Sequence, residues 1–222
     1  MSKQEQQEEP KTVKVWKTSI PKAELALLPA EVFTGNITVV SDEASAEAAA
    51  SVLSKAELIG FDTETRPSFR RGEHHNVALL QLSTPEECFL FRLNVIGLPD
   101  SIRAILEDDK LMKIGLSIKD DFISLNRKFQ FEPRNFVDLQ TFVKEFGIAD
   151  NSLSRIYGIL FDKRISKGQR LTNWEAAELT RHQHEYAALD ALACITIDRH
   201  LRDNGFDHTT SKYYREYEEP AN

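Results

Sequence analysis

Between residues 37 and 138, short apolar runs alternate with polar turns, a pattern typical of β-strands. The runs lie at 37–40, 57–64, 77–82, 88–93, 111–115 and 135–138. The second, third and fourth runs follow one another closely, separated by a polar loop at 67–76 and a turn at Pro85. This spacing predicts an antiparallel meander.

Other segments have the periodicity or composition of helices. They lie at 42–54, 100–107, 120–128, 139–146, 153–160, 175–179 and 181–204. Ser41 is expected to cap the first helix, because its hydroxyl can accept from a free backbone N–H. Gly205 is expected to end the last helix. Antiparallel strands followed by alternating strands and helices predict an α/β domain with a mixed sheet.

The two ends of the chain differ from this central region. Residues 1–15 are poor in large apolar side chains and are expected to form a disordered tail. Residues 16–36 mix apolar residues with prolines and predict an N-terminal arm packed on the domain. We therefore expect a single domain at 37–205, which suits a chain of 222 residues, followed by a C-terminal tail at 206–222.

Composition narrows the classes of function. The net charge of -7 argues against a protein that coats nucleic acid through bulk positive charge, but not against one that holds a strand end locally. No apolar run is long enough to cross a bilayer, and the polar N-terminus lacks the apolar core of a signal peptide. Cys88 and Cys194 match no metal or redox spacing. We expect a reduced, cytoplasmic protein that does not contact membranes.

Asp62 and Glu64 follow a buried apolar run and point to the same side of a strand. Two such carboxylates repel each other unless a cation or a proton lies between them. Mg2+ and Mn2+ prefer oxygen ligands and are the expected cations. Taken alone, the pair is also explained as exposed acids at a strand end.

Two further segments carry candidate acids. Tyr186 and Asp190 are four residues apart on the last helix and share a face. Asp120 and Asp121 open the helix predicted at 120–128. Each has an ordinary explanation, respectively a polar helix edge and acids that complement the helix dipole.

Together, the three segments resemble the DEDD superfamily of 3′–5′ exonucleases, in the branch with ribonuclease D and the exonuclease domain of the Werner syndrome helicase. The matching segments are LIGFDTE at 58–64, KIGLSIKDDFISL at 113–125 and NWEAAELTRHQHEYAALDA at 173–191. The resemblance covers roughly residues 37–204, and Tyr186 indicates the DEDDy subgroup. It implies a ribonuclease H-like mixed β-sheet flanked by helices and a metal-dependent 3′–5′ exonuclease.

The resemblance also implies roles for the site residues. Two divalent cations, Mg2+ or Mn2+, would stabilise the attacking and leaving oxygens. Asp62 would bridge both ions, Glu64 and Asp190 would share the ion that holds the attacking water, and Asp121 would hold the other. Tyr186 would orient that water, because a phenol with a pKa near 10 is a poor base at pH 7.

The second motif leaves an alternative open. Aligning Gly115, Ile118 and Leu125 with the family pattern selects Asp121, with Asp120 as the fallback. The family often has Arg-Pro where this chain has Ala177-Glu178, a departure that bears on substrate handling and leaves the acids intact.

Two basic loops flank the predicted site and are expected to contact phosphates at the 3′ end of single-stranded nucleic acid. They contain Arg66, Arg70 and Arg71 after the first motif, and Lys163, Arg164, Lys167 and Arg170 before the third. Ordinary solvated loop charge is the alternative. Phe69 either stacks on a base or packs locally, and the adjacent His74 and His75 are expected to be exposed.

Two competing functions remain open: a non-catalytic nucleic-acid-binding or scaffold protein on the same fold, and a phosphohydrolase of small nucleotides. The full set of acids argues against the first. We expect a monomer. Because the chain lacks room for the second helical domain of ribonuclease D, we expect either distributive action or a protein partner that supplies processivity. The choice between RNA and DNA stays open.

Overall fold

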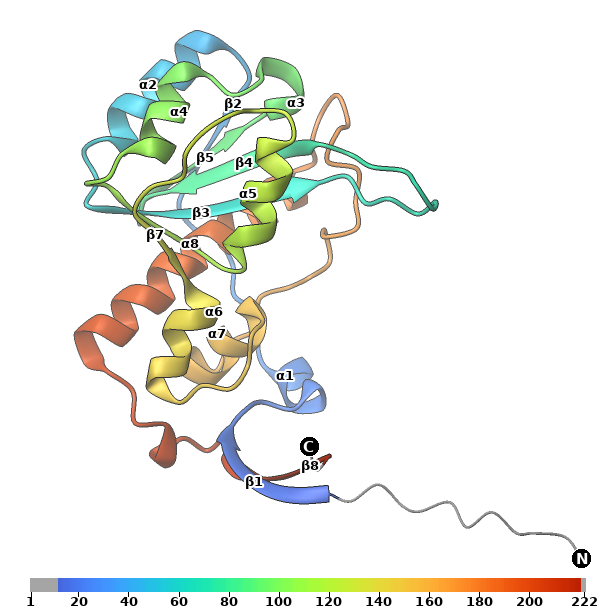
Figure 1. The fold of residues 1–222 in the computed structure, drawn as a ribbon, viewed down its shortest axis with the longest axis vertical. Helices are drawn as coiled ribbons and strands as arrows, with labels where there is room; N and C mark the ends of the chain where they lie inside the picture. Colours follow the sequence, from blue (N-terminus) through green and yellow to red (C-terminus); the bar gives the residue numbers. More distant parts are fainter. Residues whose placement is uncertain (1–11, 221–222) are drawn as a thin grey trace, which may run out of the picture.

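The computed structural model describes residues 12–220, and its centre is a six-stranded mixed sheet with the order β2-β5-β4-β3-β6-β7. The strands are β2 (Asn36–Val40), β3 (Leu58–Thr65), β4 (Val77–Ser83), β5 (Glu87–Phe91), β6 (Met112–Gly115) and β7 (Phe136–Asp138). β3, β4 and β5 pair antiparallel, which confirms the meander, while β2, β6 and β7 join by parallel pairing. The mixed α/β sheet predicted from the sequence is therefore present (Figure 1).

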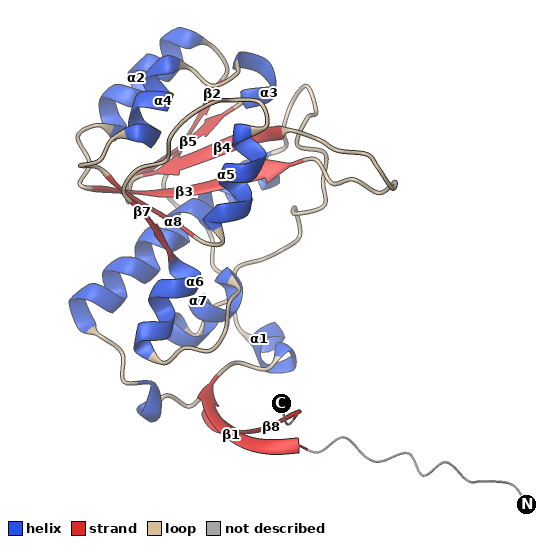
Figure 2. Ribbon diagram, viewed as in Figure 1, coloured by secondary structure: helices blue, strands red, loops and turns tan. Residues whose placement is uncertain are grey.

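Helices cover both faces of the sheet (Figure 2). They are α2 (Glu43–Leu53), α3 (Leu93–Ile96), α4 (Asp100–Glu107), α5 (Ile118–Asn126), α6 (Leu139–Phe142), α7 (Leu153–Phe161) and α8 (Arg181–Asn204), with a 3-10 turn, η1, at Val143–Phe146. On one face, Leu53 of α2 and Ile102 of α4 share an apolar cluster with Phe61 of β3. On the other face lies α8, with α6 and α7 packed beside its C-terminal half.

The close approach of α8 to β3 depends on one glycine. A β-carbon at Gly60 would collide with the carbonyl oxygen of Ala191 in α8. Any other residue at this position would push the helix away from the strand. Because side chains alternate along a strand, Asp62 and Glu64 lie on the same α8-facing side as Gly60.

The chain ends differ from the expected tails. β1 (Thr12–Thr18) pairs antiparallel with β8 (Tyr214–Pro220), and a short 3-10 helix, η2 (His208–Thr210), precedes β8. The expectation of a disordered tail is therefore wrong for residues 12–15, and residues 206–220 are ordered; 1–11 and 221–222 lie outside the described residues. Local sequence could not predict this pairing, because its two strands are about as far apart in the chain as possible.

The N-terminal arm packs on the domain as expected. It contains α1 (Lys22–Leu27) and the fully buried Ile20. Leu25 and Leu28 lie against Gly158 of α7, where a larger side chain would displace the Leu25 methyl group. The arm therefore closes the apolar cluster beneath α7 and α8.

Three local predictions need correction. Asp42, and not Ser41, caps α2, because its carboxylate accepts from the Ser45 N–H at 2.8 Å. Residues 175–179 form turns and not a helix. The carbonyl oxygens of Ala176 and Ala177 accept hydrogen bonds from the buried Arg92 guanidinium and not from the backbone of a helix. The helix expected at 139–146 is divided between α6 and η1.

Within residues 12–220, even the 24-residue α8 is too polar to serve as a membrane span, and every other helix is shorter.

Candidate active site

Three carboxylates meet between the end of β3 and the middle of α8. One ligand oxygen from each of Asp62, Glu64 and Asp190 lies within 4.8 Å of the others. We call these residues the carboxylate triad. The two-residue strand period directs the first two acids toward α8, and the contact at Gly60 brings Asp190 up to them.

The triad is electrostatically strained without a cation. The pKa of Glu64 is raised to about 9, first by burial and then by the charges of Asp190 and Asp121. Burial likewise raises the pKa of Asp190 to about 7 and that of Asp62 well above its usual range. Clustered oxygen donors that hold protons this tightly suit a hard divalent cation, which would replace the protons and neutralise the repulsion. The donor set therefore fits the metal chemistry that the motifs predicted.

The structure distinguishes the two acids of the second motif. Asp121 is half-buried and accepts a hydrogen bond from the Thr63 hydroxyl of β3. Its charge raises the pKa of Asp62 and Glu64, and its own pKa is raised to about 6, mainly by burial. Asp120 is exposed. The fold thus brings Asp121 to the edge of the triad, although it lies outside the closest group of ligand atoms.

Tyr186 lies one helical turn before Asp190, and its nearby hydroxyl lowers the pKa of the Asp190 carboxylate. Burial and then the charges of Asp190 and Glu64 raise the pKa of Tyr186 above its ordinary value. The phenol therefore stays protonated and can orient a water, but cannot act as a base. Its ring packs against the fully buried Trp174, with the ring centroids 6.1 Å apart.

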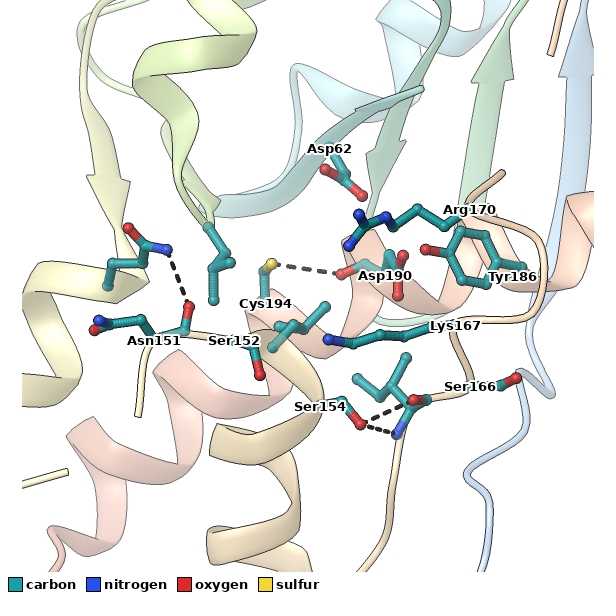
Figure 3. A pocket seen from close by; sticks show the side chains of 14 residues that line it. Asp62, Asn151, Ser152, Ser154, Ser166, Lys167, Arg170, Tyr186, Asp190 and Cys194 are labelled. Atoms are coloured by element: carbon teal, nitrogen blue, oxygen red, sulfur yellow. Dashed lines mark hydrogen bonds between the residues drawn. The ribbon is translucent and has the colours of Figure 1, made fainter. Parts of the chain in front are cut away.

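Two of the predicted basic residues lie at the triad. Lys167 and Arg170 line a cavity of about 280 Å³ together with Asp62, Tyr186 and Asp190, and their side chains point into it (Figure 3). Lys167 lowers the pKa of Asp190 and Arg170 lowers that of Glu64. Both cations therefore lie close enough to the triad to offset part of its negative charge.

The other basic residues lie elsewhere. Lys163 forms an ion pair with Glu31 of the arm at 3.0 Å, and Arg164 donates to the carbonyl oxygen of Leu28, so both fasten the arm instead of lining the cavity. For these two residues, the alternative of a role outside the substrate site fits their contacts with the arm.

The loop between β3 and β4 projects beyond the sheet (Figure 1). Arg70 and Arg71 are exposed on this loop, as is Phe69 with 79% of its surface accessible. Arg66 pairs with Glu175 at 3.3 Å. None of the four lines the cavity at the triad.

His75 contradicts the expectation of two exposed histidines. Its side chain is only 14% exposed and lies between Glu73 and Glu175, with each ring nitrogen 3.2 Å from a carboxylate oxygen. Together with Arg66, it fastens the β3–β4 loop to the turn that carries Trp174. His74 is exposed, as predicted.

Sequence reasoning missed the polar wall of the cavity. This wall comes from α6, the N-terminus of α7 and the loops before and after α7, and it consists of Gln140, Asn151, Ser152, Ser154 and Ser166. Gln140 donates to the carbonyl oxygen of Asn151 at 3.0 Å, which joins α6 to the loop before α7. No spacing in the chain marks these residues, because tertiary packing alone brings them to the cavity.

Comparison with known proteins gives a consistent result. Residues 37–205 match a family model described as 3′–5′ exonuclease. Over 189 residues, or 80% of its length, the chain is 32% identical to a mouse protein described as bifunctional 3′–5′ exonuclease/ATP-dependent helicase WRN. The chain spans less than two thirds of the length of the curated relatives it matches, and only 13% of the mouse protein.

Solved structures share the fold. Escherichia coli RNase D superposes with a TM-score of 0.69 at 22% identity, over 76% of this chain and 44% of that one. Trypanosoma brucei RNase D in complex with RNA U12 gives a TM-score of 0.66 at 18% identity, over 82% of this chain and 65% of that one. At such identities, the likeness concerns the arrangement of the helices and strands, which is the one predicted from the three motifs.

Proposed function

This chain belongs to the 3′–5′ exonuclease family, and we propose that it hydrolyses phosphodiester bonds at the 3′ end of single-stranded nucleic acid. The observation that carries the proposal is the carboxylate triad, whose ligand oxygens lie within 4.8 Å of one another beside a cavity of about 280 Å³. A binding module would gain nothing from three clustered acids with raised pKa values.

Asp62, Glu64 and Asp190, with Asp121 at their edge, would hold two divalent cations, Mg2+ or Mn2+. Bound cations would stabilise negative charge on the attacking and leaving oxygens and would acidify the attacking water. The proximity of Asp121 to β3, through the Thr63 hydroxyl, supports its assignment over Asp120.

The remaining residues of the site bind and orient. The protonated Tyr186 hydroxyl would hold the attacking water against the Asp190 carboxylate, where Trp174 keeps the ring in place. Lys167 and Arg170, which line the same cavity, would bind the phosphate. Lys167 and Arg170 would also replace part of the water around that phosphate, which would strengthen the attraction between the phosphate and the two cations.

We also assign the projecting β3–β4 loop to the substrate. Arg66, Arg70 and Arg71 would contact phosphates upstream of the scissile bond, and the exposed Phe69 would stack on a base. A single strand, unlike a duplex, can thread from this loop into the cavity. The solved complex of T. brucei RNase D with RNA U12 supports testing RNA first.

Two further assignments complete the proposal. Cys88 and Cys194 are buried free thiols, which supports a reducing, cytoplasmic compartment. We expect the chain to act as a monomer and to depend on a protein partner for processive degradation.

The test is cleavage of 5′-labelled single-stranded RNA and DNA of equal sequence with Mn2+, with Asp62→Asn as the inactive control. We expect a ladder of products shortened one nucleotide at a time from the 3′ end. The same oligonucleotide with a blocked 3′ end should resist cleavage. Binding without cleavage would favour the scaffold function, and hydrolysis of mononucleotides alone would favour the phosphohydrolase.

A further inference from the structure

One buried polar side chain next to the triad has no partner. Gln81 of β4 is completely buried, and neither its Nε2 nor its Oε1 has a hydrogen-bond partner among residues 12–220. A buried amide without partners lowers the free energy of unfolding, so apolar residues usually fill such positions. An apolar residue at position 81 would therefore give a higher free energy of unfolding than Gln81 does.

The strand register places Gln81 beside the first acid of the triad. Gln81 is directly opposite Asp62 in the antiparallel pair of β3 and β4, so both side chains lie on the face toward α8. Directly opposite residues in such a pair have β-carbons about 4.5–5.5 Å apart. A glutamine side chain is long enough to reach a carboxylate at that separation by rotation about its own bonds.

The neighbouring β4 residues on this face cannot donate a hydrogen bond to the triad. Leu79 is opposite Glu64 and has no donor, and the Ser83 hydroxyl, opposite Gly60, already donates to the carbonyl oxygen of Thr84 at 2.7 Å. The backbone N–H of Thr63 already donates to Asp62, but no side chain among residues 12–220 donates a hydrogen bond to it. Gln81 is therefore the neutral donor best placed to reach this carboxylate.

We propose that Gln81 is a positioning residue for Asp62: its Nε2 donates to one carboxylate oxygen and leaves the other directed at a bound cation. The inference rests on the proposed function, since it requires that the triad holds divalent cations. A neutral amide suits this position, because a lysine would repel the cations and a glutamate would add to the repulsion within the triad. Residues that orient metal ligands typically alter metal affinity or activity by about 10–100-fold when they are replaced.

Gln81→Met tests the proposal, because methionine keeps the length and volume of the side chain but cannot donate. We expect the dissociation constant for Mn2+, measured by calorimetry, to rise about 10-fold. The midpoint of the pH dependence of Mn2+ binding should move to higher pH, since Asp62 loses a donor that favours its ionised form. Thermal stability in EDTA should stay equal or increase, because the unpaired amide is gone.

Leu79→Met is the matched control, since it changes a buried side chain on the same strand and face without altering any donor. It should bind Mn2+ like the wild type. Gln81→Leu repeats the test should the methionine variant fold poorly.

A Gln81 variant that is folded and binds Mn2+ within twofold of the wild type, with an unshifted pH midpoint, would overturn the proposal. So would a variant whose only change is a lower thermal stability, because that is the signature of a purely structural role. If the wild type itself binds no Mn2+, the proposed metal-dependent function fails, and this inference fails with it. Nuclease activity in the wild type together with normal Mn2+ affinity in the variants would refute only the role of Gln81.

Discussion

The carboxylates of the triad and those of the N-terminal arm are placed in opposite surroundings by the same fold. In the triad, burial and mutual repulsion raise the pKa values of Asp62, Glu64 and Asp190. In the arm, Glu31 accepts hydrogen bonds from Lys163 and Tyr157, and these contacts lower its pKa despite partial burial. The arm acid stabilises the fold through a basic partner in the same chain, whereas Lys167 and Arg170 offset only part of the repulsion within the triad.

This difference indicates where the protein gives up stability for function. Glu24 shows the arm pattern again, with a pKa lowered mainly by the bidentate hydrogen bonds from Arg215. Near the triad, by contrast, Lys167 and Arg170 lower two of the pKa values but leave both above their ordinary range. Because Lys167 and Arg170 neutralise only part of the negative charge, a cation from solution would stabilise the ionised acids further. This property distinguishes a binding site from a structural ion pair.

The largest effect is expected for Asp62→Asn. Single-turnover cleavage should fall by more than about 1000-fold, because Asp62 is close enough to interact with the charges of all three other candidate ligands. Thermal stability in EDTA should be unchanged or higher, since a repelling buried charge is removed. Retention of near wild-type cleavage would falsify the assignment of the triad.

The next largest effect concerns the second motif. Asp121→Asn should reduce turnover by about 100-fold or more, whereas Asp120→Asn, on an exposed neighbour, should leave it within about twofold. On a helix, the two positions differ by about 100° in direction, so they cannot exchange roles. Parallel kinetics on both variants provide the measurement, and the reverse ranking would show that Asp120 is the ligand.

A smaller effect is expected for Tyr186→Phe. Loss of the hydroxyl should lower turnover by about 10–100-fold, corresponding to roughly 1.4–2.7 kcal/mol of transition-state stabilisation, with Mn2+ affinity unchanged. Asp190→Asn should instead weaken both turnover and Mn2+ binding. Calorimetry beside single-turnover kinetics separates the two roles, and equal loss of Mn2+ affinity in both variants would show that the tyrosine shapes the metal site.

The pH dependence of stability should have opposite signs in the two regions. With pKa values of about 9 for Glu64 and about 7 for Asp190, the folded protein binds more protons than the unfolded chain between about pH 4 and pH 9. Stability in EDTA should therefore fall as pH rises through this window, and saturating Mg2+ should remove the fall. Melting temperatures measured across the range provide the check, with Glu64→Gln as the variant that flattens the EDTA curve. A melting temperature in EDTA that rises toward pH 9 would show that the pKa values of the triad acids are not raised.

The smallest effect is expected for Glu31→Gln in the arm. Because the pKa of Glu31 is lowered, its contribution is present above the unfolded pKa near 4.3 and is lost as pH falls through the folded pKa. The free energy of unfolding at pH 7 should drop by about 0.5–1 kcal/mol, a size typical of a partly exposed ion pair. Denaturant unfolding measures this, and nuclease activity should not change. A loss of activity would show that the arm takes part in catalysis.

Local periodicity was enough to predict much of the site and of the central fold. The two-residue period of a strand placed Asp62 with Glu64, and the helical period placed Tyr186 with Asp190. The helices at 100–107 and 181–204 were predicted with the bounds that the structure has. These features depend on neighbours only a few residues away, so the chain itself carries the information.

Other features depend on which segments meet in space, and the sequence alone could not decide them. Lys163 and Lys167 lie in the same basic loop, and nothing in the sequence separates them. In the structure, Lys163 pairs with the arm and Lys167 lines the cavity. The β1–β8 pair, the polar wall of the cavity and the position of Gln81 opposite Asp62 likewise follow from packing and register. Sequence alone therefore determined which acids could form the site. Tertiary structure decided which cations and donors serve them, because a side chain's burial, partners and pKa are set by whatever other segments pack around it.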